Sequence, residues 1–392
     1  MTERLKKAQG PLVGVRVIEF ASKGPGPYCS MLLSDLGADV LRLDRAIADN
    51  SMTRTQHDPM NRGRRSVAID LKNADATAFA LDLISKADVL VEGMRPGVME
   101  RLGLGPAVAQ GINPRLVYGR MTGWGQDGPN ARLPGHDINY IATTGVLAGI
   151  GSPDGFPVPP LNLVGDYGGG MLLAFGIVAA LFERSNSNTG QVIDAAMIDA
   201  SASMMTSFFG MMRAGQWSDT NRGNNVLDGG APYYTCYQTS DGKFVAVGAV
   251  EAKFFKELLA RLGLPVSLAK DQYDRTKWPA IKDRIAAVIR EKSRDAWAHI
   301  FADAETCLSP VLTLSEAPSE PHNQARGTFI DVNGDMQPAP APRFGRTPGA
   351  IQNAPRMSGS DTISALADWG YQQNEINALI DKKVLYQTSE QE

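Results

Sequence analysis

The stretch that decides the fold class is residues 13–43, which read VGVRVIEFASKGPGPYCSMLLSDLGADVLRL. Val13–Phe20 is rich in β-branched residues and predicts a strand, and Asp39–Leu43 predicts a second one. Between them, Tyr28–Leu36 places apolar residues at helical spacing, and Gly37 ends the helix. A strand, a helix and a strand in this order predict parallel strands joined by a crossover helix.

The alternation of strands and helices continues along the chain. Val67–Leu71, Val89–Glu92 and Leu116–Met121 predict further strands, and Asp75–Lys86 predicts another helix. Such alternation is typical of a parallel sheet that is covered by helices on both faces. The expected fold class is therefore α/β, with a doubly wound, Rossmann-like large domain.

The pattern changes near residue 190. Long helices are expected at Gly169–Arg184 and Asp194–Arg213, and the Gly- and Asn-rich stretch Asn221–Gly230 predicts a linker. Tyr233–Thr239 and Lys243–Ala249 then predict a β-hairpin. A smaller α+β unit is therefore expected to begin after the linker.

Helical patterns complete this smaller unit, at Glu251–Leu262, Ala280–Arg290 and Arg294–Ala302. Pro338–Pro348 predicts a second linker, and a final amphipathic helix near Asn374–Lys382 is expected to pack back on the first domain. The predicted division is a large domain of residues 1–200 completed by 340–392, a small domain of 228–325, and linkers at 201–227 and 326–339.

Composition restricts the partners of the protein. The 392 residues include 39 Lys and Arg and 42 Asp and Glu, a net charge of −3, and this balance predicts no nucleic-acid partner. Cys29, Cys236 and Cys307 are far apart, which indicates neither a zinc site nor a disulfide framework. The most apolar run, Met171–Leu181, is shorter than a membrane span. With no apolar signal at residues 1–10 and no peroxisomal signal at 388–392, we expect a cytoplasmic protein without a membrane partner.

The turn after the first predicted strand, Gly24-Pro-Gly-Pro27, stands where a dinucleotide-binding fold places its phosphate loop. Asp44 ends the second strand, where such folds place an acid that binds ribose. However, the two prolines lack the N–H groups that a pyrophosphate needs, and the G-x-G-x-x-G spacing is absent. A nicotinamide cofactor is therefore not expected.

Basic residues lie on or just after the ends of predicted strands, where α/β sheets bind ligands. Any one of these residues taken alone is explained by a solvent-exposed surface. Together they could bind a polyphosphorylated nucleotide such as coenzyme A. They are Arg42, Arg45, Arg62, Arg64, Arg65, Lys72, Arg95 and Arg101.

Three residues are candidates for acid–base chemistry, and each has a structural alternative. His136 precedes a predicted helix, where a neutral imidazole could act as a base or could simply satisfy a loop. Asp166 precedes Gly168-Gly-Gly170 and could cap a helix or face a substrate there. Glu251 opens a helix, where it could merely complement the helix dipole. Motifs of serine hydrolases, zinc proteases and P-loop NTPases are absent, and no metal site is expected.

A series of segments in a fixed order carries a resemblance that runs nearly end to end. The segments are Gly24–Pro27, Leu36–Val40, Asp88–Gly97, Arg101–Gly105, Met121–Gly125, Gly135–Tyr140, Gly165–Gly170, Leu227–Tyr233 and Val247–Glu251. Because of these segments, the chain resembles the family III coenzyme A transferase (CaiB/BaiF) superfamily, and within it the alpha-methylacyl-CoA racemase branch.

The resemblance implies an interlocked homodimer whose subunits thread through each other's central opening. Each subunit would have a Rossmann-like large domain, closed by the returning C-terminus, and a smaller domain on long linkers. In the transferases of this superfamily an aspartate at the position of Asp166 is the covalent nucleophile, and all branches share it. A histidine at the position of His136 is typical of the racemases, so the resemblance favours that branch.

The same match assigns contacts with the coenzyme A nucleotide and with the thioester. Ile69 and Met94 are less typical residues at their positions. The full set is Arg45, Ile69, Leu71, Lys72, Gly93, Met94, Arg95, Arg101, Gly135, Asp137, Asn139 and Tyr140.

The function that the resemblance implies is racemisation of 2-methylacyl-CoA thioesters in lipid metabolism. We expect His136 and Asp166 to be the two acid–base groups, one on each face of the enolisable carbon, and Glu251 to orient and charge-balance His136. Backbone N–H groups at the helix start by Asp166 are expected to hold the thioester oxygen. No cofactor is expected, because coenzyme A is part of the substrate.

The remaining expectations concern the surface that binds the acyl tail and two alternative functions. Met197, Met204, Met205, Met211 and Met212 could form an adaptable apolar surface for the tail, although ordinary helix packing explains most of them. One alternative function is a coenzyme A transferase that uses the expected aspartate as its nucleophile. The other is a catalytically silent protein that only binds acyl-CoA.

Overall fold

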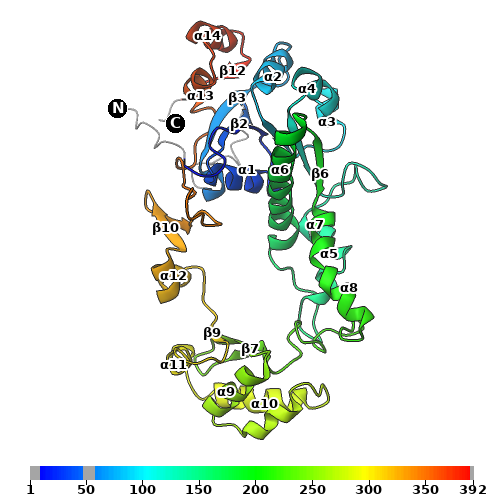
Figure 1. The fold of residues 1–392 in the computed structure, drawn as a ribbon, viewed down its shortest axis with the longest axis vertical. Coiled ribbons are helices and arrows are strands. Elements are labelled where there is room, and N and C mark those ends of the chain that lie inside the picture. The colour runs from blue at the N-terminus through cyan, green and yellow to red at the C-terminus, as the bar shows by residue number, and fades with distance from the viewer. Residues whose placement is uncertain (1–8, 47–57, 389–392) are drawn as a thin grey trace. The chain divides into compact units, whose positions relative to one another are not determined.

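The computed structural model describes residues 9–46 and 58–388 (Figure 1). The expectations about targeting signals concern residues at both chain ends, of which 1–8 and 389–392 lie outside the described residues. The chain divides into two units. The first holds the residues up to Thr144, Leu161–Ser203 and those from Gly327 on, and the second holds Gly145–Pro160 and Met204–Arg326. The prediction for residues 1–200 differs here, because it places Gly145–Pro160 in the large domain.

Among its described residues, the first unit is built on a seven-stranded sheet with the order β12-β3-β2-β1-β4-β5-β6. Strand β1 pairs in parallel with β2 on one side and with β4 on the other. The parallel strands are β1 (Arg16–Phe20), β2 (Asp39–Arg45), β3 (Arg64–Ile69), β4 (Val89–Glu92), β5 (Val117–Thr122) and β6 (Val192–Ala196). This is the strand order of a Rossmann-type sheet, and it confirms the expected α/β class.

Alternating side chains of the strands give the sheet two apolar faces. On one face, Ile18 and Phe20 of β1 pack in a core with α2 (Ala76–Ser85) and α4 (Pro106–Ile112). On the other face, Val17 packs in a second core with α1 (Pro25–Asp35) and α6 (Gly168–Ser187). Helices therefore cover both faces, as the alternating pattern predicts (Figure 1).

The starts of α1 and α6 lie against each other. A Cβ atom added to Gly170 would stand 2.5 Å from the carbonyl oxygen of Pro25, so only glycine permits this approach. The glycines that open α6 thus bring the turn before α1 close to the turn before α6. This packing builds one wall of the candidate site.

The C-terminal segment completes the first unit. Strand β12 (Leu385–Tyr386) pairs antiparallel with β3, and α13 (Thr362–Asp368) and α14 (Gln373–Asp381) lie before it. Ile376 of α14 is fully buried in the core that also holds β1 side chains. The final helix therefore packs on the first unit, as expected.

The second unit is α+β. Strands β7 (Tyr234–Gln238), β8 (Phe244–Gly248) and β9 (Leu308–Pro310) form an antiparallel sheet. Side chains of both the sheet and the helices form its core. The principal helices are α9 (Ala252–Arg261), α10 (Trp278–Ile289) and α11 (Arg294–Ile300), with α8 (Thr206–Arg213) and α12 (Pro321–Arg326) nearer the ends of the long segment.

Two expected elements are wrong. The helix predicted over Asp194–Arg213 starts too early, because residues 192–196 form β6, and α7 (Met197–Met204) is separate from α8. Val192 and Ile193 favour a strand but Ala195 and Ala196 favour a helix, so backbone pairing with β5 overrides the local preference at the end of this edge strand. The predicted linker 326–339 contains a hairpin of β10 (Phe329–Val332) and β11 (Asp335–Pro338). Its Asn-Gly turn at residues 333–334 is a hairpin signal that the sequence analysis missed.

Residues 163–187 form a helix that is long and apolar enough to cross a membrane, by length and composition only. It is longer than the apolar run Met171–Leu181 on which the sequence expectation rested. In the first unit Leu173 and Ile177 of α6 are fully buried against the sheet. This burial is typical of a core helix.

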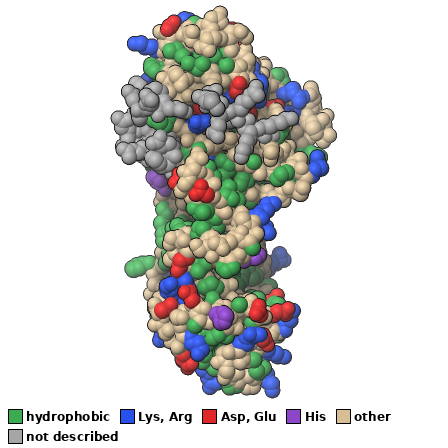
Figure 2. Space-filling model, turned by 90° about the vertical axis from the view of Figure 1, so that its left-hand side faces the viewer, with side chains coloured by type: hydrophobic (Ala, Val, Ile, Leu, Met, Phe, Trp, Pro, Cys, Tyr) green, Lys and Arg blue, Asp and Glu red, His purple; other side chains and the backbone are tan. Residues whose placement is uncertain are grey.

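Charges of both signs are interspersed on the face that Figure 2 shows, without one large patch of a single sign. Four of the arginines that the sequence analysis grouped with Arg45 are buried in ion pairs of the first unit, namely Arg42, Arg62, Arg64 and Arg65.

Candidate active site

A cavity of about 590 Å³ lies at the carboxyl end of the parallel sheet, within the first unit. Its walls include Lys23–Gly26 after β1, Gly93–Pro96 after β4 and Thr122–Trp124 at the end of β5, together with residues from the segments 131–140 and 161–166. The crossovers change direction between β1 and β4, and ligands of open α/β sheets bind in the crevice at such a point. The cavity is therefore the candidate active site.

Asp166 reaches the cavity from the π-helical turn Leu163–Tyr167, which leads directly into α6. Nδ2 of Asn162 donates a hydrogen bond to Oδ2 of Asp166 over 3.0 Å. Burial raises the pKa of the Asp166 carboxyl, and the charge of Asp137 acts in the same direction, whereas Asn162 and His136 lower it. The group is thus tuned toward exchange of a proton nearer neutral pH than an ordinary aspartate.

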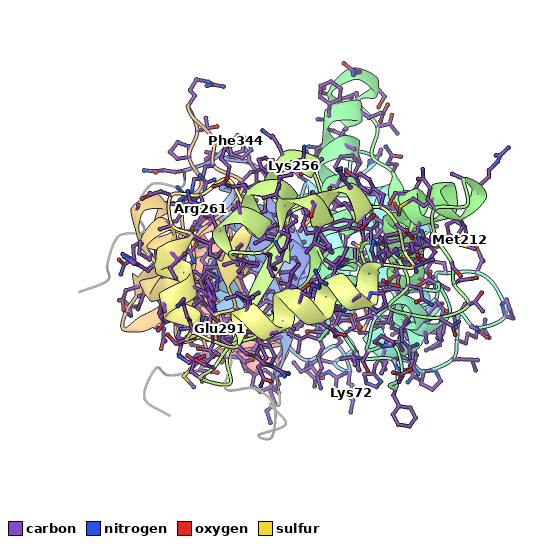
Figure 3. All side chains as sticks on the ribbon, turned by 90° about the horizontal axis from the view of Figure 1, so that it is seen from below. Lys72, Met212, Lys256, Arg261, Glu291 and Phe344 are labelled. Atoms are coloured by element: carbon purple, nitrogen blue, oxygen red, sulfur yellow. The ribbon has the colours of Figure 1, made fainter. Side chains whose placement is uncertain are left out.

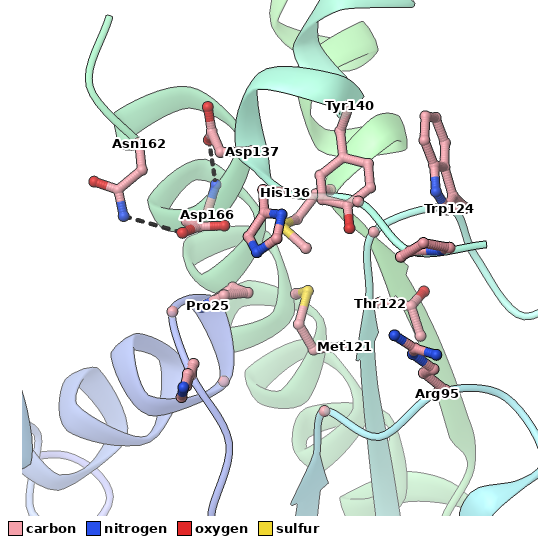
Figure 4. Close-up of a pocket in the computed structure, with 18 of the residues that line it drawn as sticks. Pro25, Arg95, Met121, Thr122, Trp124, His136, Asp137, Tyr140, Asn162 and Asp166 are labelled. Atoms are coloured by element: carbon pink, nitrogen blue, oxygen red, sulfur yellow. Dashed lines mark hydrogen bonds between the residues drawn. The ribbon is translucent and has the colours of Figure 1, made fainter. Parts of the chain in front are cut away.

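His136 is the N-cap residue of α5 (Asp137–Ala142), and its exposed side chain lines the same cavity. Its backbone N–H donates to Oδ1 of Asn139 over 3.0 Å, and the N–H of Asn139 donates back to the carbonyl of His136 over 2.8 Å. Asn139, expected to contact substrate, therefore holds the main chain of His136. In Figure 4 the imidazole lies beside the carboxylate of Asp166.

The expected oxyanion donors beside Asp166 are engaged within the protein. The N–H of Asp166 donates to Oδ1 of Asp137 over 2.8 Å, that of Tyr167 donates to the carbonyl of Asn162, and that of Gly168 donates within the turn. Because the π-helical turn continues into α6 without a free first turn, these groups are not available to a thioester. This expectation of the sequence analysis is wrong.

Tyr140 and Trp124 form the opposite wall. Their rings meet edge to face with centroids 4.8 Å apart, and both line the cavity with Arg95. A Cβ atom added to Gly123 would overlap the Tyr140 ring, and one added to Gly135 would stand 2.7 Å from it. Burial raises the pKa of the Tyr140 hydroxyl, Asp166 adds to this effect and Arg95 opposes it. The phenol therefore stays neutral near pH 7 and is available to donate a hydrogen bond.

Several basic residues that the sequence grouped as nucleotide ligands serve the protein core instead. Arg64 is fully buried with Glu19, and Arg62 pairs with Asp35 over 2.6 Å. Likewise Arg42 pairs with Asp44 over 2.8 Å, and Arg65 pairs with Asp39 over 2.8 Å and with Asp368 over 2.6 Å. Except for Asp44, which lies two residues from Arg42, the acidic partners come from distant segments, which explains why strand-end position alone misled the interpretation.

The other predicted contacts divide between the cavity and the sheet edge beside it. Gly93, Met94, Arg95, Gly135, Asp137 and Tyr140 line the cavity, together with His136 and Asp166. Arg45 and Lys72 are exposed at the carboxyl ends of β2 and β3, and Arg101 is exposed at the end of α3 (Val98–Arg101). Lys72 projects outward in Figure 3.

Ile69 and Leu71 lie among apolar side chains rather than at the cavity. Ile69 is buried in the core of the first unit, and Leu71 packs against that core. Their side chains are therefore occupied by packing, so a contact with substrate at these two positions would have to use the main chain.

Glu251 belongs to the second unit, where it is the N-cap residue of α9, as its position before a helix predicts. Its carboxylate is exposed. The carbonyls of the two preceding residues, Ala249 and Val250, accept hydrogen bonds from Nε2 of the buried Gln272 over 3.4 and 2.8 Å. The contact between Glu251 and His136 stays a prediction.

The structure adds cavity residues that the sequence analysis did not single out. Asn162 is the direct partner of Asp166, and its only signal was a polar side chain four residues earlier in the chain. Thr122 is the last residue of β5 and Trp124 follows it, at the end of a strand where parallel sheets bind ligands. Of the predicted methionine cluster, Met197 lines the cavity, whereas Met212 is exposed on α8 (Figure 3).

A family model matches most of the chain. The model of the CoA-transferase family III matches residues 12–362, and the chain belongs to this family. The chain is 42% identical to "Alpha-methylacyl-CoA racemase" of Mus musculus over 379 residues, which cover 95% of this chain and 97% of the mouse protein. It is 42% identical to the Homo sapiens protein of the same name over 378 residues, with 95% and 97% covered.

A solved structure supports the fold. The CAIB/BAIF family protein from Brucella suis superposes with a TM-score of 0.79 and 24% identity, over 92% of this chain and 100% of that one. At this level of identity the likeness concerns the fold alone.

Proposed function

We propose that this enzyme interconverts (R)- and (S)-2-methylacyl-CoA thioesters, the activity that its mouse and human relatives are named for. The observation that carries the proposal is that His136 and Asp166, one imidazole and one carboxylate, line a single cavity at the switch point of the sheet. Inversion at a carbon next to a thioester needs a group that removes a proton and a group that returns one. This pair supplies both.

The reaction moves a proton and no electrons. One group in its deprotonated form, a neutral imidazole or a carboxylate, takes the α-proton, and the thioester becomes an enolate. The other group, protonated, then delivers a proton to the opposite face, and the roles exchange for the other enantiomer. Because burial raises the pKa of Asp166, the form of the pair that carries its shared proton on the carboxyl is more populated than it would be with an ordinary aspartate. The mechanism requires neither metal nor organic cofactor.

The enolate oxygen needs hydrogen-bond donors, and the start of α5 offers them. The first N–H groups of a helix have no acceptor within it, and Asp137 and Ile138 at the start of α5 both line the cavity. A donor placed at a developing oxyanion typically lowers the barrier by ~3 kcal/mol. These N–H groups replace the donors beside Asp166 that the sequence analysis expected.

The nucleotide of coenzyme A would follow the carboxyl edge of the sheet, away from the cavity. Arg95 stands at the cavity itself, while Arg45, Lys72 and Arg101 lie exposed on or after neighbouring elements. Cationic side chains in such positions bind phosphates. Binding energy from the nucleotide would hold the reacting carbon between the two acid–base groups.

We further propose that the enzyme is a homodimer of interlocked subunits, and that Glu251 orients His136 within it. The outer face of α6 supports an interface, because Met171, Phe175 and Phe182 are 56%, 71% and 74% exposed at helical spacing. Exposed apolar stripes of this kind usually mark interaction surfaces. A large domain and a small domain on linkers would suit the threading of the subunits.

One experiment tests the function and separates it from a coenzyme A transferase that uses Asp166 as nucleophile. Purified protein is incubated with 2-methylacyl-CoA in heavy water, with and without a free carboxylic acid. Deuterium at the α-carbon without added acid supports the racemase. Acyl exchange that occurs only with added acid supports the transferase, and neither reaction despite binding would leave a silent acyl-CoA binder.

A pair of variants tests the site. His136→Ala should abolish the exchange of deuterium while affinity for coenzyme A stays largely unchanged. His322→Ala removes an exposed imidazole from α12 and serves as the matched control. Exchange that survives in the His136 variant would overturn the role of this histidine.

A further inference from the structure

Asp137 joins the two proposed acid–base groups. It follows His136 directly as the first residue of α5, and its side chain is 7% exposed. Its Oδ1 accepts the backbone N–H of Asp166 over 2.8 Å (Figure 4). One residue therefore links the helix that carries the imidazole to the turn that carries the carboxylate.

Gly165 makes this link possible. A Cβ atom at residue 165 would stand 2.4 Å from Oδ1 of Asp137, far inside normal contact. Any side chain there would push the π-helical turn away from α5. The turn and the helix are thus held at a close approach that only glycine allows.

The charge of Asp137 also acts on Asp166. Its Oδ2 is buried and has no hydrogen-bond partner among the described residues, so its negative charge is poorly compensated. Other charged or titratable groups that share the cavity with Asp166 are His136 and Tyr140 of α5, together with Lys23 and Arg95. Asp137 is the acidic member of this set.

We propose that Asp137 is a positioning residue whose carboxylate fixes where Asp166 stands relative to His136. Its charge opposes the ionisation of Asp166 and so keeps a proton available on the pair. The hydrogen bond from the Asp166 N–H to Asp137 and the close approach at Gly165 set the separation of His136 and Asp166. Both groups would then keep a constant distance from the α-carbon of the substrate. This inference rests on the proposed function for its catalytic meaning, but the geometry and the titration of Asp166 are measurable without turnover.

Two variants separate geometry from charge. Asp137→Asn keeps an oxygen that can accept the Asp166 N–H and removes the charge. We expect kcat/KM at the optimum to change by less than about 10-fold, and the acidic limb of the pH profile to move to lower pH. Gly165→Ala keeps the charge and displaces the turn, and a misplaced catalytic group costs on the order of 10²-fold in rate.

A direct titration keeps the test independent of activity. Asp166 is followed by carboxyl ¹³C NMR in the wild type and in Asp137→Asn, with thermal unfolding to verify folding. A lower Asp166 pKa in the variant is expected. An unchanged titration together with an undisturbed rate in Gly165→Ala would overturn the inference. Absence of deuterium exchange in the wild type would instead refute the proposed function, while the titration still decides the role of Asp137.

Discussion

A Cβ atom on Gly24 would stand 3.0 Å from Oδ2 of Asp166, the carboxylate that we propose as one of the two acid–base groups. Gly24 has φ of 68° and ψ of −113°, a positive-φ conformation that favours glycine. The Gly-Pro-Gly-Pro turn after β1 therefore serves as a wall for this carboxylate. In a dinucleotide-binding fold the same position would hold a phosphate.

Gly24→Ala should impair catalysis more than folding. The added methyl group would press on the carboxylate and shift it, at a cost on the order of 10²-fold in kcat/KM for deuterium exchange. Gly215→Ala is the matched control, because Gly215 has φ of 69° and no atom within 4 Å of an added Cβ. Gly215→Ala should lose about 1–2 kcal/mol of stability from its positive φ, and Gly24→Ala should lose at least as much. Equal rates in the two variants would contradict the role of this contact.

Asn162→Ala should move the acidic limb of activity to higher pH. The hydrogen bond from Asn162 favours the ionised form of Asp166, and its loss raises a pKa that burial already raises. At low pH both groups of the pair are protonated and no base is present, so activity falls at a higher pH than in the wild type. The measurement is kcat/KM against pH.

Asn130→Ala, in the exposed loop before α5, is the control for this profile. If the acidic limb of the pH profile of Asn162→Ala stays at the wild-type pH, then this limb does not reflect the ionisation of Asp166. The acidic limb is expected to move to higher pH in Asn162→Ala and to lower pH in Asp137→Asn. Opposite shifts in the two variants would together show that this limb reports the titration of Asp166.

The sequence predicted the sheet well because each strand carries its own local pattern. Val89–Glu92 is a strand at the predicted bounds, and His136 and Asp166 do share a cavity. The supporting contacts could not be predicted in the same way. The pairing of Arg64 with Glu19, or of Asp137 with the Asp166 N–H, joins segments far apart in the chain. Only the folded backbone determines whether a strand-end arginine faces a ligand or the core.

Arg64→Met should destabilise the first unit strongly. Arg64 and Glu19 are both fully inaccessible, and Arg64 also donates to Oδ1 of Asn61 over 2.6 Å. Removing the cation leaves a buried carboxylate without its partner, which costs about 3–5 kcal/mol. Urea unfolding measures the loss. Lys86→Met breaks the exposed i,i+4 pair with Asp82 and should cost at most ~0.5 kcal/mol; comparable losses in both variants would refute the argument.

Phe175→Glu combined with Phe182→Glu should dissociate the proposed homodimer. Both rings lie on the exposed apolar face of α6, and a carboxylate buried in an interface without a partner is costly. Sedimentation equilibrium should report a dimer for the wild type and a monomer for the double variant. Glu183→Lys changes a charge on the same helix beside that face and should remain dimeric. A monomeric wild type would refute the dimer, and a dimeric double variant would exclude this face from the interface.

Gln272→Leu should lower kcat with little change in KM. Its fully buried amide donates to the carbonyls of Ala249 and Val250, directly before Glu251. Leucine fills a similar volume and leaves these acceptors without the donor, which costs about 1–3 kcal/mol and loosens the start of α9. KM should stay unchanged, because the residues that we propose to contact the nucleotide lie in the first unit.

Tyr273→Phe is the control for this loss, since the Tyr273 hydroxyl donates to the same Val250 carbonyl over 3.4 Å from an exposed ring. If Gln272 acts through Glu251, then Gln272→Leu should add little to the defect of Glu251→Gln, because the carboxylate that it positions is already neutralised. Fully additive losses in kcat would mean that Gln272 stabilises the second unit without serving Glu251.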